Sequence, residues 1–480
     1  MIPLRLSEIA RITGGEIHDA LGGSGADPLV DGPVVTDSRE ASVGSLYVAR
    51  VGEALDGHQF VAGARARGAV AALTSRPVDD LPCVVVADVQ AAFVALASAL
   101  IEHNAHVVVI AITGSSGKTS TKDLLLSVLQ RHGETVANVG SLNSEVGVPL
   151  TVCRITATTA FLVLEMGARA IGHLAYLTRM APPQIGVVLN VGTAHVGEFG
   201  SQEAIGTAKA ELVQALPATG FAVLNADDPI VSAMAGQTRA HVIPVGESTL
   251  ATVRAVDISL DPKGRASFTL VTDQGSAPVA LGLYGEHHVG NALAVAAVAL
   301  AVGMTPQDVA TALGGARPLS RWRMEVHERA DGVTIVNDAY NANPESMRAA
   351  LKTLAIMGKG RRTWAVLGEM RELGDGSTAE HEDLGRLAIR LNVSRVVAVG
   401  ERTQPIHDAA QLEAAQINGA VGEGSTWVRD VDAAFELLRH ELRPGDVVLV
   451  KSSHDAGLRL LGDRLVDDGL MDNSGSEGSS

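Results

Sequence analysis

The run ITGSSGKTST at residues 112–121 has the composition of a phosphate-binding loop. Gly114 and Gly117 would let the backbone bend so that its N–H groups point at phosphate oxygens. Lys118 would add a positive charge, and Thr119 a hydroxyl for Mg²⁺. Ile112 stands where the full motif has its first glycine. The preceding apolar strand and the following helical pattern supply the context that predicts a nucleotide site.

Three further side chains could take part in the same chemistry. Glu165 ends the apolar run FLVLEM, where a carboxylate suits a hard metal ion, although an exposed edge acid is the alternative. His195 lies in the loop after IGVVLNV, and a single loop histidine is weak evidence by itself. Lys209 lies on the apolar stripe of a helix. Burial would favour its neutral amine, which can capture CO₂ as a carbamate. The pattern alone favours the alternative, a lysine that extends its ammonium to the surface.

The elements that must position these residues fall into three blocks. The first, residues 1–104, is a small α/β unit with strand candidates at Ser45–Ala49, Ala69–Leu73 and Cys83–Ala87 and a helix candidate at His58–Arg67. The second, residues 105–314, alternates continuous apolar runs with amphipathic helices that begin at Lys118, Ala170 and Ser201. That alternation predicts a parallel sheet covered on both faces. A polar, strand-like insert at about 240–283 and a helix at 290–302 complete it.

The third block, residues 315–470, repeats the same rhythm and predicts a second doubly wound domain. Its strand candidates are VTIVND, TWAVLGEM, RVVAVG and DVVLVKSS, and its helix candidates are 344–357, 379–391, 404–415 and 431–440. The last ten residues, 471–480, are predicted to be a disordered tail. The expected fold is therefore α/β with three domains: a small α/β domain, a central ATPase-like parallel-sheet domain and a C-terminal Rossmann-like domain.

The composition excludes several classes of partner. A net charge of −16 argues against DNA or anionic lipid, and 3% aromatic residues leave few platforms for stacking on nucleic-acid bases. No apolar stretch is long enough to span a membrane, and the N-terminus lacks the apolar run of a signal peptide. The two cysteines form neither a disulfide framework nor a zinc spacing. A cytoplasmic protein is expected, and a monomer, since no coiled coil is visible.

Taken together, the motifs resemble the Mur ligases of peptidoglycan synthesis and their folylpolyglutamate-synthetase relatives. The resemblance is carried by TGSSGKT, LEMGA, NVGTAHVGEFGS, the Lys209 helix, NADDP and YGEHHVGNALAV in the second block, and by RWRMEV, NDAYNANPESM and AVLGEMRELGD in the third. It spans residues 30 to 460. It implies an ATP-dependent ligase that adds D-alanyl-D-alanine to UDP-N-acetylmuramoyl-tripeptide through an acyl phosphate.

The resemblance also implies roles for individual residues. Lys118 and its loop would hold the ATP phosphates; the loop comprises Thr113, Gly114, Ser115, Ser116, Gly117, Lys118, Thr119 and Ser120. One Mg²⁺ would be bound by Thr119 and Glu165, and a second by His195 and by Lys209 as its carbamate. Lys118, His195 and Lys209 would be the catalytic residues. For the nucleoside, Asn291 would contact adenine, and Arg323 and Asp338 would meet phosphate and ribose.

Two other sites are implied for the substrates. TDSRE and DGHQF resemble the uridine-nucleotide-binding domain, where Ser38 and Arg39 would contact the UDP moiety; an ordinary polar turn is the alternative. Asn341, Asn343 and Ser346 would contact the peptide or dipeptide, although helix capping alone also explains that run. Glu369 and His381 are expected to face the dipeptide. The run KSSHDAGLR departs from the family pattern at His454 and Asp455, and Ser115 and Ser116 replace a Thr-Asn pair.

Two rival functions remain open. Another ligase of the same family would add a single amino acid, or glutamate on a folate; the NANPESM run and the UDP-binding block argue against it. A nucleotide-dependent switch would release phosphate without any amine and would not need Lys209. The sequence does not distinguish lysine from diaminopimelate as the third residue of the peptide stem.

Overall fold

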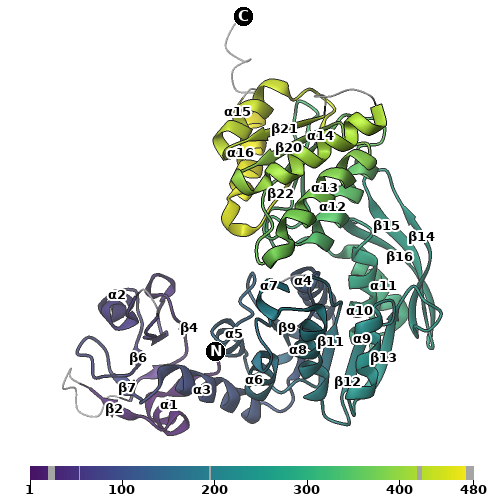
Figure 1. The fold of residues 1–480 in the computed structure, drawn as a ribbon. Helices are drawn as coiled ribbons and strands as arrows, with labels where there is room; N and C mark the ends of the chain where they lie inside the picture. Colours follow the sequence, from purple (N-terminus) through teal and green to yellow (C-terminus); the bar gives the residue numbers. More distant parts are fainter. Residues whose placement is uncertain (20–26, 53–54, 194–195, 419–423, 472–480) are drawn as a thin grey trace, which may run out of the picture.

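The computed structural model describes residues 1–19, 27–52, 55–193, 196–418 and 424–471. His195 and the predicted tail beyond Met471 lie outside the described residues. Figure 1 shows an N-terminal domain beside a central domain, with a C-terminal domain above the central one. The predicted α/β fold class with three such domains is confirmed. The boundaries placed after residues 104 and 314 stay predictions.

The N-terminal domain is built on a five-stranded sheet in the order β2-β7-β6-β5-β4, in which only β2 is antiparallel to its neighbour. The helix expected at His58–Arg67 is wrong in its first turn, because residues 57–60 form a 3-10 helix capped by Asp56. The elements are β1 Leu4–Arg5, α1 Leu6–Thr13, β2 Glu16–His18, β3 Leu29–Val30, β4 Val34–Val35, η1 Ser38–Glu40, β5 Leu46–Val48, η2 Gly57–Phe60, α2 Val61–Ala66, β6 Ala71–Thr74, β7 Cys83–Val85 and α3 Val89–His103.

Helix α3 joins the N-terminal domain to the central one. Its apolar residues, such as Leu96 and Leu100, belong to the same buried cluster as Leu162 and Leu164 of the central sheet. The Ser98 hydroxyl donates to the carbonyl of Met180 at 3.0 Å. The two domains therefore share one apolar core, which fixes the N-terminal domain against the central sheet.

The central domain holds a nine-stranded sheet in the order β16-β15-β14-β13-β12-β11-β8-β10-β9. The polar insert expected at 240–283 extends this same sheet as β13 to β16, with antiparallel pairing from β14 onward. The elements are β8 Val108–Thr113, α4 Lys118–Leu129, β9 Glu134–Ala137, α5 Gly147–Val152, β10 Thr159–Glu165, α6 His173–Met180, β11 Ile185–Val188, α7 Val196–Phe199, α8 Gln202–Gln214, β12 Phe221–Asn225, α9 Pro229–Ala233, η3 Met234–Gln237, β13 His241–Gly246, β14 Val253–Leu260, β15 Arg265–Thr272, β16 Gly275–Tyr284, α10 His288–Ala301 and α11 Pro306–Gly315.

Strand β8 shows why its sequence is a continuous apolar run. Successive side chains of a strand point to opposite faces of the sheet. Val109 and Ala111 pack into the cluster shared with α3, whereas Ile110 and Ile112 pack into the cluster formed with α4 and α10. Both faces of β8 are thus buried. The phosphate loop follows the carboxyl end of β8, which lies between β11 and β10 in the sheet. The helix expected from Ala170 begins instead at His173, after Gly172, whose φ is 91°.

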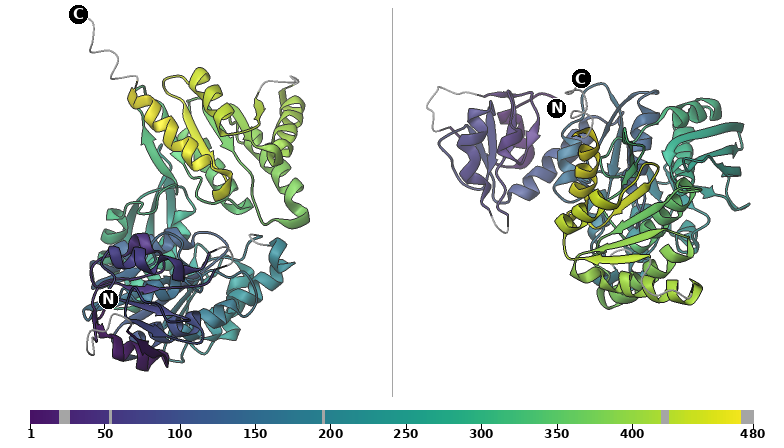
Figure 2. Two further views of the ribbon diagram at one scale, coloured as in Figure 1. Left: turned by 90° about the vertical axis from the view of Figure 1, so that its left-hand side faces the viewer. Right: turned by 90° about the horizontal axis from the view of Figure 1, so that it is seen from above.

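The C-terminal domain has a six-stranded sheet in the order β17-β18-β22-β19-β20-β21. Helices α12, α13 and α14 cover one face, and α15 and α16 the other (Figure 2). The elements are β17 Glu325–Glu328, β18 Thr334–Asn337, α12 Pro344–Met357, β19 Thr363–Leu367, η4 Gly374–Gly376, α13 Ser377–Arg390, β20 Arg395–Val399, η5 Glu401–Thr403, α14 Gln404–Asn418, β21 Ser425–Val428, α15 Val431–Glu441, β22 Val447–Lys451, η6 His454–Ala456 and α16 Leu458–Met471. Across the described residues, no helix is long and apolar enough to cross a membrane.

Candidate active site

The phosphate loop follows β8 directly and ends where α4 begins. Gly117 is the residue before the helix and has a φ of 80°, in the left-handed region that glycine tolerates. A Cβ at Gly117 would lie 2.6 Å from the side-chain oxygen of Asn291. Asn190 lies just past the end of the neighbouring strand β11 and holds the loop in place, since its side-chain oxygen accepts from the Ser116 N–H at 2.8 Å. The loop is thus an open, backbone-lined cradle at a helix N-terminus, as phosphate binding requires.

Lys118 lies in this cradle with its ammonium turned back onto the loop. Its Nζ donates to the carbonyl of Gly114 at 2.7 Å. Burial lowers the pKa of Lys118, while the carboxylate of Glu165 acts in the opposite direction. A bound phosphate would offer Lys118 an anionic acceptor in place of a neutral carbonyl, so that both partners of the hydrogen bond would be charged.

Glu165 and Thr119 are in contact with each other and line the same cavity as the phosphate loop. The Thr119 hydroxyl donates to Glu165 Oε2 at 2.9 Å, and Asn143 donates to Oε1 at 2.7 Å. Glu165 is only 1% exposed at the end of β10. A hydroxyl and a carboxylate oxygen in contact are hard ligands of the kind Mg²⁺ takes. Among the described residues, no three His, Cys, Asp or Glu side chains are grouped to hold a metal ion.

Lys209 is buried on α8, at 5% exposure, and lines the cavity that contains the phosphate loop. The alternative in which it reaches the surface is therefore wrong. Burial, with a smaller contribution from the charge of Lys118, lowers the pKa of Lys209 well below its ordinary value. This shift favours the neutral, nucleophilic amine that carbamate formation needs.

The C-terminal domain brings two of the predicted nucleotide contacts to the same cavity. Asp338 follows β18 and accepts from Lys451 Nζ at 2.6 Å. The Arg323 guanidinium lies over the ring of Tyr340, 4.4 Å from its centroid, and donates to Ser141 at 3.4 Å. Its Nε is buried and has no partner within the described part of the chain. A donor of this kind, facing a cavity, fits an anionic or hydroxyl-bearing ligand.

Asn343 and Ser346 begin α12 as a reciprocal capping box. Asn343 Oδ1 accepts from the Ser346 N–H at 2.8 Å, and the Ser346 hydroxyl accepts from the Asn343 N–H at 3.1 Å. Asn343 Nδ2 also donates to the carbonyl of Ser115 in the phosphate loop at 3.3 Å. The exposed side chain of Asn341 accepts from the Ala342 N–H. All three predicted dipeptide contacts line the cavity, and two of them already carry out capping.

Replacing Asn343 with alanine should lower the free energy of unfolding of the C-terminal domain by about 1 kcal/mol, the usual contribution of an N-cap. Urea denaturation followed by fluorescence would measure it. Asn341→Ala, two residues earlier and without a cap, is the matched control and should change stability by less than about 0.5 kcal/mol. Equal effects of the two substitutions would contradict the capping role.

Direct contacts hold the C-terminal domain against the central one. Glu345 Oε1 accepts from the N–H and hydroxyl of Thr193 at 2.8 and 3.0 Å. The Gly197 N–H donates to the carbonyl of Glu372 at 3.2 Å. Gly192 permits the close approach, since a Cβ there would lie 2.6 Å from Glu345 Oε1. The two domains are therefore drawn together around the phosphate loop.

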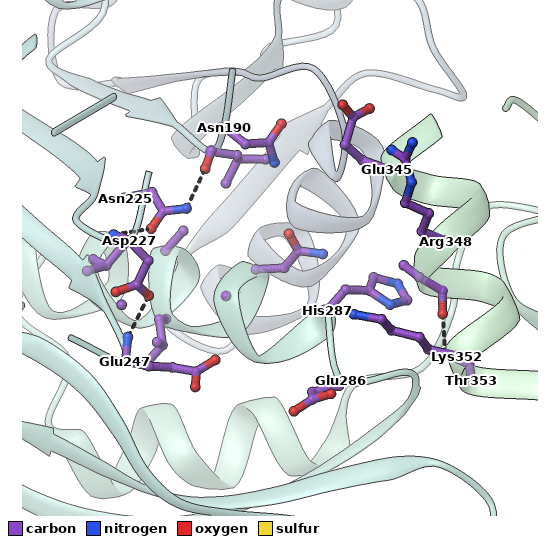
Figure 3. Close-up of a pocket in the computed structure, with 18 of the residues that line it drawn as sticks. Asn190, Asn225, Asp227, Glu247, Glu286, His287, Glu345, Arg348, Lys352 and Thr353 are labelled. Carbon is purple, nitrogen blue, oxygen red and sulfur yellow. Dashed lines mark hydrogen bonds between the residues drawn. The ribbon is translucent and has the colours of Figure 1, made fainter. Parts of the chain in front are cut away.

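Two cavities result from this closure. One, of about 410 Å³, is lined by the phosphate loop, Glu165, Lys209 and the C-terminal residues just described. The other, of about 520 Å³, lies between the ends of β11 to β13 and helix α12 (Figure 3). The predicted adenine contact Asn291 lines both. The sites around Lys118, Glu165 and Lys209 thus meet in one place, as the sequence predicted.

Some predicted residues lie elsewhere. Ser38 and Arg39 belong to the 3-10 helix η1 of the N-terminal domain and line neither cavity. The Arg39 side chain is 81% exposed and pairs with Asp37 at 2.6 Å. His381 is wrong as a residue that faces the dipeptide, because it is 1% exposed and accepts from the Met370 N–H inside the C-terminal domain. His195 lies outside the described residues, so its role stays a prediction.

Sequence reasoning assigned no role to Asn190, Glu345 or Lys451. Asn190 and Lys451 each follow or end an apolar strand, so the polar residue at a strand end was an available signal. Glu345 carried no such signal, because its partner Thr193 is 152 positions away in the chain.

Comparisons with known proteins agree with this arrangement. Residues 33–109 match the model "Mur ligase family, catalytic domain", residues 112–299 "Mur ligase middle domain", and residues 322–454 "Mur ligase, glutamate ligase domain". A UDP-N-acetylmuramoyl-tripeptide–D-alanyl-D-alanine ligase of Mycobacterium tuberculosis is 48% identical, over 98% of each chain. The crystal structure of MurF from Acinetobacter baumannii has a TM-score of 0.83 and 33% identity, over 97% of this chain and 99% of that one. MurF from Thermotoga maritima in complex with ADP has a TM-score of 0.77 and 27% identity, over 92% and 98%.

Proposed function

This chain belongs to the Mur ligase family, and we propose that it uses ATP to join D-alanyl-D-alanine to UDP-N-acetylmuramoyl-tripeptide in peptidoglycan precursor synthesis. The observation that carries the proposal is the convergence of the phosphate loop, Glu165, Lys209 and the start of α12 on one cavity between two domains. The name of the mycobacterial relative supports the choice of substrates.

ATP fits the residues that line this cavity. The phosphate loop would take the phosphates, with Lys118 moving from the Gly114 carbonyl to a phosphate oxygen. Asn291 would contact adenine, and Arg323 and Asp338 would bind phosphate and ribose. The relative from Thermotoga maritima, whose structure is a complex with ADP, supports nucleotide binding.

Mg²⁺ fits the contacting oxygens of Thr119 and Glu165. We propose a second ion held by His195 and by Lys209 as its carbamate, which would turn a buried amine into an anionic ligand. Bound Mg²⁺ would supply charge neutralisation to the phosphoryl group.

The reaction would proceed in two steps. The tripeptide carboxylate attacks the terminal phosphorus of ATP, the bond to ADP breaks, and an acyl phosphate forms. Lys118 and the N-terminal dipole of α4 stabilise the negative charge on the transferring group. The deprotonated amine of D-alanyl-D-alanine then attacks the acyl carbon, and the tetrahedral intermediate collapses to an amide and inorganic phosphate. The contact between Glu345 and Thr193 keeps the domains together, which excludes the water that would hydrolyse the acyl phosphate.

The N-terminal domain would hold the nucleotide end of the substrate. The exposed guanidinium of Arg39, with Ser38 beside it, suits a diphosphate. We also propose that the protein acts as a monomer in the cytoplasm, where the two buried and unpaired cysteines, Cys83 and Cys153, would stay reduced.

Phosphate release measured with UDP-N-acetylmuramoyl-tripeptide tests the proposal. Steady release should require D-alanyl-D-alanine, because the acyl phosphate is expected to wait for an amine in a closed site. Single amino acids and folates should not replace the dipeptide. Release that continues unchanged without any amine would instead indicate the nucleotide-dependent switch.

A further inference from the structure

The segment that joins the central domain to the C-terminal domain carries Arg323. This linker, residues 316–324, follows α11, which ends at Gly315, and leads into β17, which begins at Glu325. Arg323 lines the phosphate cavity, although it belongs to neither the phosphate loop nor the strand ends beside it. The position of its guanidinium relative to the loop therefore depends on how the linker is held.

Two residues of the linker have a backbone conformation that residues with large side chains rarely adopt. Trp322 has a φ of 59° and Met324 a φ of 49°, so a left-handed residue lies on each side of Arg323. Such a conformation is unfavourable by itself and persists only where the surroundings impose it. The linker thus owes its path to the contacts that hold it.

Three carboxylates hold the linker by alternate backbone N–H groups. The Ser320 N–H donates to Asp123 at 3.0 Å, the Trp322 N–H to Glu325 at 2.9 Å, and the Met324 N–H to Asp338 at 3.0 Å. Glu325 and Asp338 belong to the C-terminal domain, whereas Asp123 lies on α4 of the central domain. The central domain therefore holds the linker at Ser320, and the C-terminal domain holds it from Trp322 onward.

Asp123 lies on the helix that begins at Lys118. A helix keeps the spacing between its residues, so Asp123 has a fixed position relative to the phosphate loop. Asp123, Ser320 and Arg323 also line one small cavity of about 20 Å³, which makes them close neighbours. Asp123 thus connects the helix of the phosphate loop to the segment that carries Arg323.

The Asp123 carboxylate is itself fixed by a buried network. Its Oδ1 pairs with Lys122 Nζ at 2.6 Å, and both side chains are buried. Lys122 Nζ donates to the carbonyl of Asn138 at 3.0 Å, and Asn138 Oδ1 accepts from the Glu165 N–H at 2.6 Å. Because apolar residues of similar size often stabilise a fold as well as a buried ion pair does, stability alone does not account for this pair.

We propose that Asp123 is a positioning residue for ATP binding, and that by holding the Ser320 N–H it places the Arg323 guanidinium at the phosphate cavity. The proposal rests on the function proposed above, in which Arg323 contacts ATP. Arg323 Nε is buried without a hydrogen-bond partner among the described residues, and its Nη2 donates to Ser141 at 3.4 Å. The guanidinium is therefore available to a ligand, and Asp123 sets its reach from the central domain.

Two double variants separate the bond to the linker from the ion pair. Lys122→Met with Asp123→Asn removes both charges but keeps a side-chain oxygen for the Ser320 N–H. Lys122→Met with Asp123→Leu has nearly the same shape and removes that oxygen as well. Both should fold, because neutral groups can replace a buried ion pair without loss of stability.

The Michaelis constants of the two double variants report the effect of the lost bond. KM for ATP should be about 10-fold higher with Asp123→Leu than with Asp123→Asn, because the Arg323 contact is then misplaced. KM for D-alanyl-D-alanine should differ by less than about twofold. Neither constant depends on the fraction of protein that is folded. Equal KM values for ATP in the two double variants would overturn the proposal.

Arg323→Met tests whether Asp123 acts through Arg323. Alone it should raise KM for ATP by about 10- to 100-fold, the range of a charged hydrogen bond. Added to each double variant, it should bring their KM values for ATP within about twofold of each other, since the contact that Asp123 adjusts is gone. A difference that persists in full would overturn the proposal, as would an unchanged KM in Arg323→Met alone.

Ser320→Ala is the matched control, because Asp123 binds the main chain of Ser320 and not its hydroxyl. Its KM for ATP should stay within about twofold of wild type. A rise like that of the Asp123→Leu double variant would assign the effect to the hydroxyl and contradict the role of the main-chain bond.

The wild-type assay separates this inference from the proposed function. Wild-type ADP formation with UDP-N-acetylmuramoyl-tripeptide that does not need D-alanyl-D-alanine would remove the proposed function. Dipeptide-dependent ADP formation, together with equal KM values for ATP in the two double variants, would remove only the role of Asp123.

Discussion

Lys118→Met is expected to lower kcat for ADP formation by about 10³-fold while the protein remains folded. The substitution removes the one charge that reaches into the phosphate cradle from α4, and loss of a single donor to a developing oxyanion typically costs 10²–10³-fold. Methionine keeps the length and apolar stem of the side chain, so the packing around the loop should survive. A coupled assay of ADP formation at saturating ATP would measure the effect.

Lys359→Met provides the control for Lys118→Met, because it removes an exposed lysine with the same substitution. Its kcat should stay within about twofold of wild type. Less than a 10-fold loss in Lys118→Met would show that the loop does not carry the transferring phosphate. Circular dichroism of both variants establishes that they are equally folded.

Lys209→Met is expected to act in opposite directions on activity and on stability. Activity should fall by about 10³-fold, because methionine cannot form the carbamate that would help to hold a metal ion. Stability at neutral pH should rise by more than about 1 kcal/mol, the equivalent of about one unit of lowered pKa, because methionine removes an amine that folding forces to give up its proton. Urea unfolding and the ligase assay, run on the same preparation, would show both effects.

The pH dependence of the Lys209 effect follows from its lowered pKa. Burial holds the folded-state pKa well below the ordinary value of 10.5, so the unfolded chain binds more protons between those two values. The free energy of unfolding contributed by Lys209 therefore rises as pH increases through that window. In Lys209→Met this slope should be absent. Its persistence would mean that Lys209 is not the group responsible.

The carbamate itself has a readout that does not depend on activity. Wild-type protein equilibrated with ¹³C-bicarbonate should show a carbamate resonance that is missing in Lys209→Met. If both proteins give the same spectrum, the carbamate is excluded, and the activity loss needs another explanation.

The sequence predicted the parts of this site that short-range patterns determine. The strand–loop–helix context of Lys118 and the apolar run ending at Glu165 each involve neighbours in the chain, and the structure confirms both elements. The burial of Lys209 could not be predicted from its position on the apolar face of a helix. A lysine at such a position can be buried or can extend its ammonium to the surface, depending on which elements pack against the helix.

Long-range contacts were beyond such patterns. His381 was expected to lie where the third domain faces the dipeptide, yet its ring forms hydrogen bonds with Met370 and Ser377 inside the domain. Glu345 looked like an ordinary first-turn acid of α12, a position that acids favour at helix N-termini. Its contact with Thr193 exists only because two domains meet, which no single segment encodes.

The apolar core that α3 shares with the central sheet has a consequence for how substrates would be placed. Because separating the N-terminal and central domains would expose this core to water, we expect their spacing to be kept during turnover. A substrate held by its nucleotide in the N-terminal domain would then meet the phosphate loop at a distance set by the packing of α3. Opening of the site is instead expected where the C-terminal domain contacts the central one, as at Glu345 and Thr193.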